Sequence, residues 1–449
     1  MNSRLTQLLR SSVLQRLGRG IAAQGYGHVV AISLQLATVP ILLWVWGEAR
    51  YGSWLLLSAL TTYLTLSDLG FAQAATNDMT VSMSNNRTDE ARRTFHSLLA
   101  LGLLIGSVVI LIGAALAALL SLTELMNLRG ISELEAKAVT LVLAVQVAFA
   151  ILSGGLSGAL RAEGRFATMS MINNSARLAE GVACLAAAAA GGGVIGAAVA
   201  MLLVRVLNVG LVFWLLLRGT PVFRPGISAA RPRELRRLWG PSLSFMAFPL
   251  GNALMIQGAL TLIGLRFPGA VALFATSRTL ARLGATVLGS VNHVFLFDYG
   301  RTLGSGDRPA FLRLLQLNGI LIAGGLIAYS AVMLLLGPVF YERWTGGRLS
   351  LELTLLAALV ALSAAETVWA YAQTPLIAVN VHWRVAVGYL IGAVTTLGVG
   401  AITLGRGLGI EGFLALQATM YLILTSLIVV DLYRRLHRPM AIEASRSTV

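Results

Sequence analysis

Residues 98–120 read LLALGLLIGSVVILIGAALAALL, and none of these 23 positions carries a charged side chain. A helix of about 20 apolar residues spans the hydrocarbon core of a bilayer, so this stretch predicts a transmembrane helix. The whole chain shares this character: of its 449 residues, 57% are hydrophobic and 12% are charged, against about 25% charged residues in ordinary soluble domains. The sequence therefore predicts a multi-pass membrane protein.

Further apolar stretches lie on both sides of residues 98–120, separated by charged or turn-rich breaks. Together they predict an all-α integral membrane protein with twelve transmembrane helices. The run Gly191-Gly192-Gly193 predicts a tight external turn between the fifth and the sixth helix. The predicted spans are 21–46, 53–76, 98–120, 139–160, 171–190, 194–217, 241–264, 270–297, 314–338, 352–380, 385–405 and 411–432.

The positive charge of the chain is explained mainly by its orientation in the membrane. The 34 Lys and Arg residues outnumber the 19 Asp and Glu residues, which gives a net charge of +15. With the N-terminus in the cytoplasm, 24 of the 34 cations fall in cytoplasmic segments, seven in external segments and three deep inside spans. This positive-inside pattern predicts that both termini are cytoplasmic. The basic excess therefore does not indicate nucleic-acid binding, and Cys184, the only cysteine, excludes a scaffold of internal disulfides.

The chain divides into two halves around a basic segment. Residues 218–240 carry six arginines and three prolines, and they predict a cytoplasmic linker between an N-terminal six-helix lobe, 21–217, and a C-terminal one, 241–432. Because six is even, both lobes have the same orientation, which describes a parallel repeat around a central cavity. The spacing of leucines and arginines in residues 1–20 favours an amphipathic helix on the inner leaflet over a frayed tail. Residues 433–449 are predicted to be a cytoplasmic tail.

The region of the second predicted span resembles a known family. It reads Tyr51-Gly52-Ser53-Trp54-Leu55-Leu56-Leu57, continues to Tyr63-Leu64, and reaches Ser67-Asp68-Leu69-Gly70. This stretch resembles the second helix of polysaccharide flippases in the multidrug/oligosaccharidyl-lipid/polysaccharide (MOP) exporter superfamily. The twelve spans, the basic mid-chain linker and the short external turns are similar to that family over nearly the whole chain.

The resemblance implies a MOP-type fold and a flippase of the bacterial inner membrane, acting in surface polysaccharide (O-antigen type) biosynthesis. Such a protein moves an undecaprenyl-diphosphate-linked oligosaccharide from the cytoplasmic to the periplasmic leaflet by alternating access. Its expected partners are this lipid-linked glycan, the lipid bilayer and polysaccharide polymerase machinery, and not nucleic acid.

Three arginines are predicted deep inside spans. Arg278 and Arg282 lie four residues apart on the eighth span, so they share one helix face near the midplane. An ionisable group there costs about 2.5–3.5 kcal/mol on insertion scales and indicates a functional site by default. A diphosphate supplies fixed negative charge and matches the donor geometry of a guanidinium. Arg278, Arg282 and Arg205 are therefore the predicted diphosphate-binding residues, with internal salt bridges to acids as the alternative.

Three acids within spans are the predicted gating or ion-coupling residues: Asp68, Glu180 and Glu366. The helices of Glu180 and Arg205 are joined by a very short turn, so a structural ion pair is as well favoured as a role in the cavity. Glu366 can pair with Arg278 or Arg282, or bind a coupling proton or cation. Asp68 can close an inner gate, make a structural pair or cap a helix end.

The motifs that are missing favour a transporter over an enzyme. The only lysine follows Ala136, so the chain has no P-loop Gly-Lys, and it has neither His-Glu-x-x-His nor Asp-x-Asp. No metal or other cofactor is predicted. The longest external loop, 121–138, is too short for a catalytic domain, which disfavours an integral-membrane glycan polymerase or transferase. A cation-coupled multidrug exporter of the same superfamily is the stronger rival, but three arginines against two glutamates near the midplane favour an anionic head group.

Overall fold

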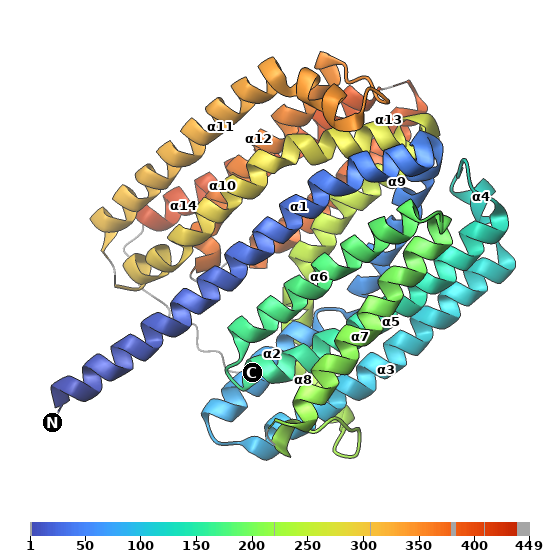
Figure 1. Ribbon diagram of the computed structural model, residues 1–449. Coiled ribbons are helices and arrows are strands. Elements are labelled where there is room, and N and C mark those ends of the chain that lie inside the picture. Colours follow the sequence, from blue (N-terminus) through green and yellow to red (C-terminus); the bar gives the residue numbers. More distant parts are fainter. Residues whose placement is uncertain (1, 220, 306, 379–382, 408, 438–449) are drawn as a thin grey trace. The chain divides into compact units, whose positions relative to one another are not determined.

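The computed structural model describes residues 2–219, 221–305, 307–378, 383–407 and 409–437, and every regular element within these ranges is a helix (Figure 1). The all-α prediction is therefore confirmed. The N-terminal helices are α1 (Asn2–Thr65), α2 (Phe71–Ser84), α3 (Thr88–Leu119), α4 (Leu122–Leu125), α5 (Glu133–Ala162), α6 (Phe166–Ala189) and α7 (Gly193–Leu217). The remaining helices are α8 (Pro232–Ala253), α9 (Ala259–Arg266), α10 (Val271–Ser305), α11 (Arg308–Thr345), α12 (Leu353–Ala378), α13 (Trp383–Gly405) and α14 (Ile410–His437).

The described chain supports the prediction of a multi-pass membrane protein. Nine of its helical segments are long and apolar enough to cross a membrane, and one of these, Gly25–Ser84, contains two predicted spans. The helices α6 and α10 coincide with two further predicted spans, although polar residues such as Glu180 and Arg278 lower their hydropathy. Each of the twelve predicted spans thus overlaps a described helix.

The chain departs from regular helix between the predicted spans 21–46 and 53–76, and again inside the second of them. In α1 the backbone leaves the helical region at Gly47 (φ 73°, ψ 175°), a conformation that glycine adopts without steric cost. The span 53–76 is not one helix, because α1 ends at Thr65 and a short 3₁₀ turn, Leu66–Asp68, follows. Leu69 and Gly70 then have φ values of 51° and 76°, before α2 begins at Phe71. Asp68 consequently lies in a helix break and not inside a continuous span.

The amphipathic helix predicted for residues 1–20 is tested only in its backbone. Residues 2–20 are helical and run without interruption into the rest of α1. The side chains of residues 1–22 lie outside the described part of the structure, so the predicted apolar and basic faces remain a prediction. The same holds for most of the predicted tail, 433–449, of which residues 438–449 lie outside the described residues.

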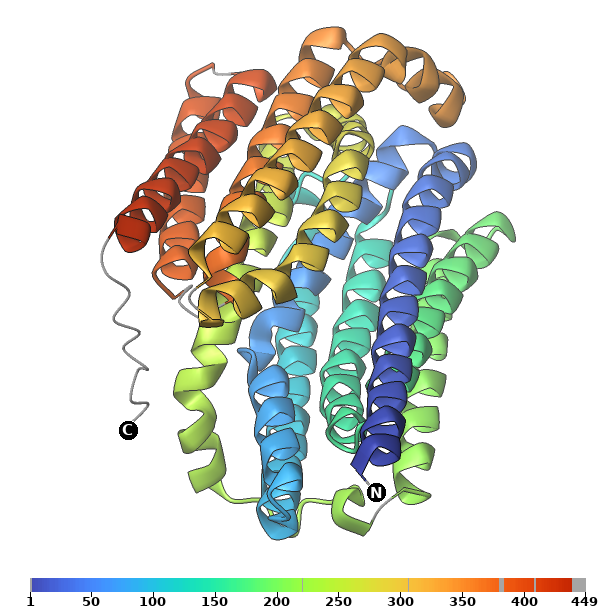
Figure 2. The ribbon, with the colours of Figure 1, turned by 90° about the vertical axis from the view of Figure 1, so that its left-hand side faces the viewer.

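Contacts between residues divide the chain into two units. Unit 1 comprises Met1–Pro249 and Phe267–Ala272, and unit 2 comprises Leu250–Arg266 and Leu273–Val449. Within unit 1, α5 packs against α3 and α7. The helix α6 packs against α7 and against the first part of α1, and Figures 1 and 2 show α6 running beside α1. Within unit 2, α12 packs against α11 and α14, and α13 packs against α14. The lobe boundaries 21–217 and 241–432 stay predictions.

Small residues allow the close approach of the helices in unit 1. A Cβ atom added at Gly113 of α3 would lie 2.6 Å from the Cβ of Ala144 in α5, and one at Gly106 would lie 3.2 Å from that of Ala148. Because lipid provides no hydrophobic drive between helices, such backbone proximity and van der Waals packing are what hold them together. This packing fixes α5, which supplies one wall of the site described next.

Candidate functional site: a polar cavity in unit 1

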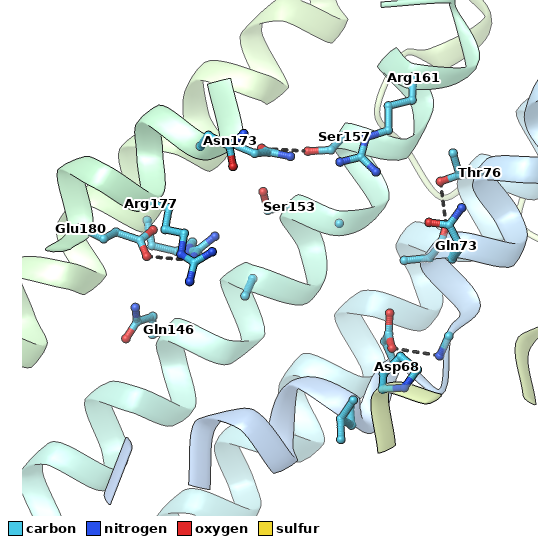
Figure 3. A pocket seen from close by; sticks show the side chains of 18 of the residues that line it. Asp68, Gln73, Thr76, Gln146, Ser153, Ser157, Arg161, Asn173, Arg177 and Glu180 are labelled. Atoms are coloured by element: carbon cyan, nitrogen blue, oxygen red, sulfur yellow. Dashed lines mark hydrogen bonds and ion pairs between the residues drawn. The ribbon is translucent and has the colours of Figure 1, made fainter. Parts of the chain in front are cut away.

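Unit 1 contains a cavity of about 870 Å³. Its walls come from α1, the break at residues 66–70, α2, α5, α6, α7 and the last unit 1 residues of α8, and Figure 3 shows many of its side chains. The apolar part of the lining includes Leu34, Ala150 and Met201. The polar part is larger than expected for a lipid-embedded helix bundle and comprises Asp68, Gln73, Thr76, Gln146, Ser153, Ser157, Arg161, Asn173, Asn174, Arg177, Glu180 and Arg205.

Helical spacing explains how two helices present these polar groups to one space. On α5 the lining residues Ser153, Ser157 and Arg161 are four apart, which places them on one face. On α6 the lining residues Asn173, Arg177 and Glu180 follow at intervals of four and three, again on one face. Figure 3 shows the two faces opposite each other, and Ser157 Oγ lies 3.5 Å from Asn173 Oδ1.

The small-residue run of α5 serves both packing and the cavity. A Cβ added at Gly158 would lie 2.3 Å from Oγ1 of Thr76, and one at Gly155 would lie 3.4 Å from the side chain of Leu98. These two glycines allow α2 and α3 to approach α5 closely. Ser153 and Gly154, by contrast, line the cavity.

One ion pair crosses the cavity wall between neighbouring helices. Nη2 of Arg205 in α7 donates to Oε2 of Glu180 in α6 at 2.8 Å, as the short connection between these helices predicted. The Glu180 side chain is 7% exposed and that of Arg205 is 25% exposed. Oε1 of Glu180 and Nε of Arg205 are buried and make no hydrogen bond in the described chain. A polar ligand or water in the cavity can satisfy these groups.

Two further arginines line the cavity without an acidic partner. Among the described residues, no carboxylate lies within ion-pair distance of Arg161 or Arg177. The guanidinium of Arg161 lies 5.6 Å from the ring centre of Phe166, and its buried Nε makes no hydrogen bond. With Arg205 included, three arginines face two acids, Asp68 and Glu180. The lining therefore carries a net charge of plus one. Because Arg205 pairs with Glu180, Arg161 and Arg177 are the two arginines of the lining without an ion-pair partner among the described residues.

Asp68 also lines this cavity, at the break between α1 and α2. Its Oδ1 accepts a hydrogen bond of 3.0 Å from the backbone N–H of Gly70. This bond stabilises the turn that the left-handed conformations of Leu69 and Gly70 create. This hydrogen bond agrees with the alternative in which Asp68 caps a helix end. A role of Asp68 in gating stays a prediction.

The other predicted site residues belong to unit 2. Nη2 of Arg282 in α10 donates to Oε1 of Glu366 in α12 at 2.7 Å, so one of the two predicted pairings of Glu366 is present. Arg278 is 7% exposed, lies 5.8 Å from the ring centre of Phe274 and donates from Nη1 to the carbonyl of Ile256 at 3.4 Å. That carbonyl lies in a wide π-helical turn, Leu254–Gly258, where the regular hydrogen-bond ladder is interrupted.

The sequence-based prediction missed Arg161 and Arg177. Both were counted with the cations that set membrane orientation, because each lies at or near the cytoplasmic end of a predicted span. The available signal was the polar face Asn173, Arg177 and Glu180 of the fifth span, which a lipid-facing helix would not carry.

Comparisons with known proteins identify the fold. No family model matches the chain, and no curated protein matches it. The chain is similar to an inward-facing multidrug resistance MATE family transporter of the MOP superfamily (TM-score 0.66, 16% identity, covering 90% of this chain and 98% of that one). It is also similar to the MATE multidrug transporter DinF-BH (TM-score 0.69, 14% identity, 93% and 95% covered). An outward-facing MATE transporter of the MOP superfamily matches as well (TM-score 0.61, 17% identity, 93% and 95% covered). The chain is a multi-pass membrane protein with the fold of the MATE transporters of the MOP superfamily.

Proposed function

We propose that this protein is a transporter and that the cavity of unit 1 binds its substrate. The substrate class is a lipid-linked oligosaccharide with a diphosphate, moved from the cytoplasmic to the periplasmic leaflet of the bacterial inner membrane. The observation that carries this proposal is the pair of unmatched cations, Arg161 and Arg177, in the cavity wall. Two arginines that line one cavity without a carboxylate within ion-pair distance leave positive charge that an anionic ligand can balance.

The chemistry of the lining suits both parts of such a head group. A guanidinium can bind phosphate oxygens through two parallel charge-assisted hydrogen bonds, and Arg161 and Arg177 provide two such forks. The amide side chains of Gln73, Gln146 and Asn173 provide donors and acceptors for sugar hydroxyls. The apolar polyprenyl chain would remain in the bilayer. A substrate that has these three parts is undecaprenyl diphosphate carrying an oligosaccharide for surface polysaccharide. The polysaccharide polymerase machinery would act on it after transport.

The residues predicted from the sequence keep roles within this proposal. Arg205 belongs to the diphosphate site, since its side chain lines the cavity beside Glu180. Asp68, Glu180 and Glu366 are proposed to gate the site or couple it to an ion during alternating access. Arg278 and Arg282 are proposed as diphosphate ligands at a later step of transport, in which Arg282 exchanges Glu366 for the phosphate.

A multidrug exporter is the second candidate function. The similar structures include multidrug transporters, and Asp68 and Glu180 offer two carboxylates to an organic cation. The charge of the lining opposes this alternative, because Glu180 is neutralised by Arg205 and two arginines then remain against one acid, Asp68. A glycan polymerase or transferase has no such structural support.

A paired experiment separates the two candidates. We expect the double variant Arg161→Gln, Arg177→Gln to abolish surface polysaccharide and to accumulate lipid-linked intermediates, with protein level unchanged. The matched control, Arg165→Gln with Arg224→Gln, removes two cations that do not line the cavity and should export normally. In the same cells the accumulation of a cationic dye is measured. Normal polysaccharide combined with increased dye accumulation in the cavity variant would instead identify a drug exporter.

A further inference from the structure

A second, smaller hollow lies at the opposite end of α3 from its external loop. It measures about 270 Å³ and is lined by Arg92 and Arg93 of α3, by Arg231, by Asp89 and by the segment Ser228–Ala229. Residues 218–231 connect α7 with α8 and belong to the basic linker expected on the cytoplasmic side. Both parts of the hollow lie in unit 1. None of the residues that line this hollow lines the large cavity, so the proposed transport site does not explain it.

The wall formed by the linker is held in place by hydrogen bonds to α3. Nδ1 of His96 accepts from the backbone N–H of Ala229 at 3.0 Å, so its Nε2 carries the proton and donates to the carbonyl of Arg224 at 3.1 Å. Ser97 Oγ accepts from the backbone N–H of Arg231 at 2.8 Å and lies 3.2 Å from its carbonyl. His96 and Ser97 are 5% and 1% exposed. The linker therefore forms a fixed wall, which positions Arg231 opposite Arg92 and Arg93.

The charges in the hollow are not balanced from within the protein. Three arginines face one acid, Asp89. Neighbouring cations at this end do have partners: Arg87 pairs with Glu90, and Arg237 pairs with Asp78 and Glu234. By contrast, no described carboxylate lies within ion-pair distance of Arg92, Arg93 or Arg231. The three arginines and Asp89 together carry a net charge of +2, which an external anion can balance.

The position of the hollow along α3 indicates where that anion comes from. Leu103 and Leu104 are 48% and 62% exposed, and each lies eleven residues after one of the two arginines. Eleven residues make about three helical turns and about 16 Å, so Arg92 and Arg93 continue the lipid-facing stripe of α3 beyond its apolar part. Counted from Leu98, where the predicted span begins, Arg93 and Arg92 lie five and six residues away, which is about 8–9 Å along the helix axis. The head-group region extends about 5–8 Å beyond the hydrocarbon core, so the long side chains of both arginines can reach lipid phosphates there.

We propose that Arg92, Arg93 and Arg231 form a binding site for the phosphate of an anionic phospholipid in the cytoplasmic leaflet. The site does not depend on the transport substrate, because none of its residues lines the large cavity. It does depend on the predicted orientation with a cytoplasmic N-terminus. Bound lipid would join α3 to the linker before α8, both within unit 1.

The test uses the full-length protein in nanodiscs of phosphatidylcholine with increasing fractions of phosphatidylglycerol. Bound anionic lipid is counted by native mass spectrometry, and unfolding is followed by thiol labelling of the single buried cysteine, Cys184. The variant is Arg92→Gln, Arg93→Gln, Arg231→Gln. The matched control, Arg224→Gln, Arg233→Gln, Arg236→Gln, removes three exposed cations from the same end without touching the hollow.

We expect phosphatidylglycerol to raise the unfolding temperature of the wild type and of the control. The affinity of the site variant for this lipid should fall by at least about tenfold, since each arginine near an anionic surface contributes about 1 kcal/mol. An equal loss in the variant and the control would overturn the proposal, because it would show non-specific surface attraction. In phosphatidylcholine discs, inorganic phosphate should raise the unfolding temperature far less. If phosphate alone stabilised the wild type and phosphatidylglycerol did not, the ligand would be a soluble phosphate and the lipid assignment would be wrong.

Discussion

In the described part of the chain, each unit contains a partly buried arginine–glutamate pair between two helices, and the surroundings of the two pairs differ. In unit 1, Arg205 and Glu180 are 2.8 Å apart and face a cavity of about 870 Å³ that two further arginines line. In unit 2, Arg282 and Glu366 are 2.7 Å apart, and Trp369 follows Glu366 by one turn of α12. That indole ring packs against Tyr389 and Tyr421, with ring centres 4.5 and 5.5 Å away.

The comparison shows that the number of buried charges does not identify a binding site. The sequence places two arginines on α10 and one on α7, which favours α10 as the anionic site. The structure matches one of the α10 arginines with Glu366 and encloses the other, Arg278, beside Phe274 and a backbone carbonyl. The unmatched cations that face open space belong to unit 1. What matters for binding is the charge that remains after pairing, and the space beside it.

The largest effects are expected from cutting the two pairs. Glu180→Gln and Glu366→Gln each leave a partly buried guanidinium without its carboxylate. Breaking a fully buried pair costs about 3–5 kcal/mol, which is an upper bound for these two pairs. We expect both variants to lose stability and transport, with Glu180→Gln the milder of the two in stability, because the cavity can hydrate Arg205. Thiol labelling of Cys184 reports unfolding of unit 1, and circular dichroism reports unfolding of the whole chain.

Exchanging the partners sharpens the same comparison. The exchange Arg282→Glu, Glu366→Arg should restore both stability and transport if that pair only joins α10 and α12. The exchange Glu180→Arg, Arg205→Glu should restore stability but not transport, because it moves the charges that face the cavity. Full transport after the unit 1 exchange would reduce that pair to a structural role. Transport lost after the unit 2 exchange, in a stable protein, would assign Arg282 or Glu366 to the transport cycle.

The sequence predicts the helices of this molecule better than its cavity, and it offers each of the two ion pairs only as one alternative. Spans depend on local hydropathy, and the Glu180–Arg205 pair follows from a turn of three glycines that forces α6 and α7 together. The cavity depends on which faces of α2, α5 and α6 meet, which is a property of packing between distant segments. Arg161 was therefore indistinguishable from an orienting cation. The break at Leu66–Gly70 was missed because Leu69 adopts a left-handed conformation that its residue type does not favour.

A smaller effect is expected at Arg278, a buried arginine of unit 2 that has no carboxylate within ion-pair distance among the described residues. A buried charge without a partner lowers stability, and its replacement by a well-packed apolar residue is often neutral or stabilising. We expect Arg278→Met to raise the free energy of unfolding by about 1 kcal/mol while impairing polysaccharide export. The control Arg343→Met changes an exposed arginine in the last turn of α11 and should alter neither. A destabilised Arg278→Met protein would mean that the bond to Ile256 and the contact with Phe274 make Arg278 a structural residue.

The smallest effect concerns one loop in each unit, the loop between α3 and α5 and the loop after α11. Glu133 lies ahead of the predicted span 139–160, and its carboxylate accepts hydrogen bonds from the backbone N–H groups of Leu122 and Thr123 at 2.9 Å and from the Thr123 hydroxyl. The bonds from Thr123, with smaller contributions from Leu122 and Lys137, lower the pKa of Glu133 from 4.5 to about 2. In unit 2 the loop after α11 contacts that helix through Thr345, whose hydroxyl donates to the carbonyl of Leu349 at 3.5 Å.

A folded-state pKa below the unfolded value stabilises the loop fully above pH 4.5, and this contribution is lost as the pH falls towards 2. We therefore expect hydrogen exchange at the amides of Leu122 and Thr123, corrected for intrinsic rates, to accelerate over that interval. The loop after α11 should show no such change, because a threonine hydroxyl does not titrate there. The variant Glu133→Gln cannot titrate at this position and should exchange at a pH-independent corrected rate. An equal pH dependence in Glu133→Gln and in the wild type would place the titrating group elsewhere in the loop.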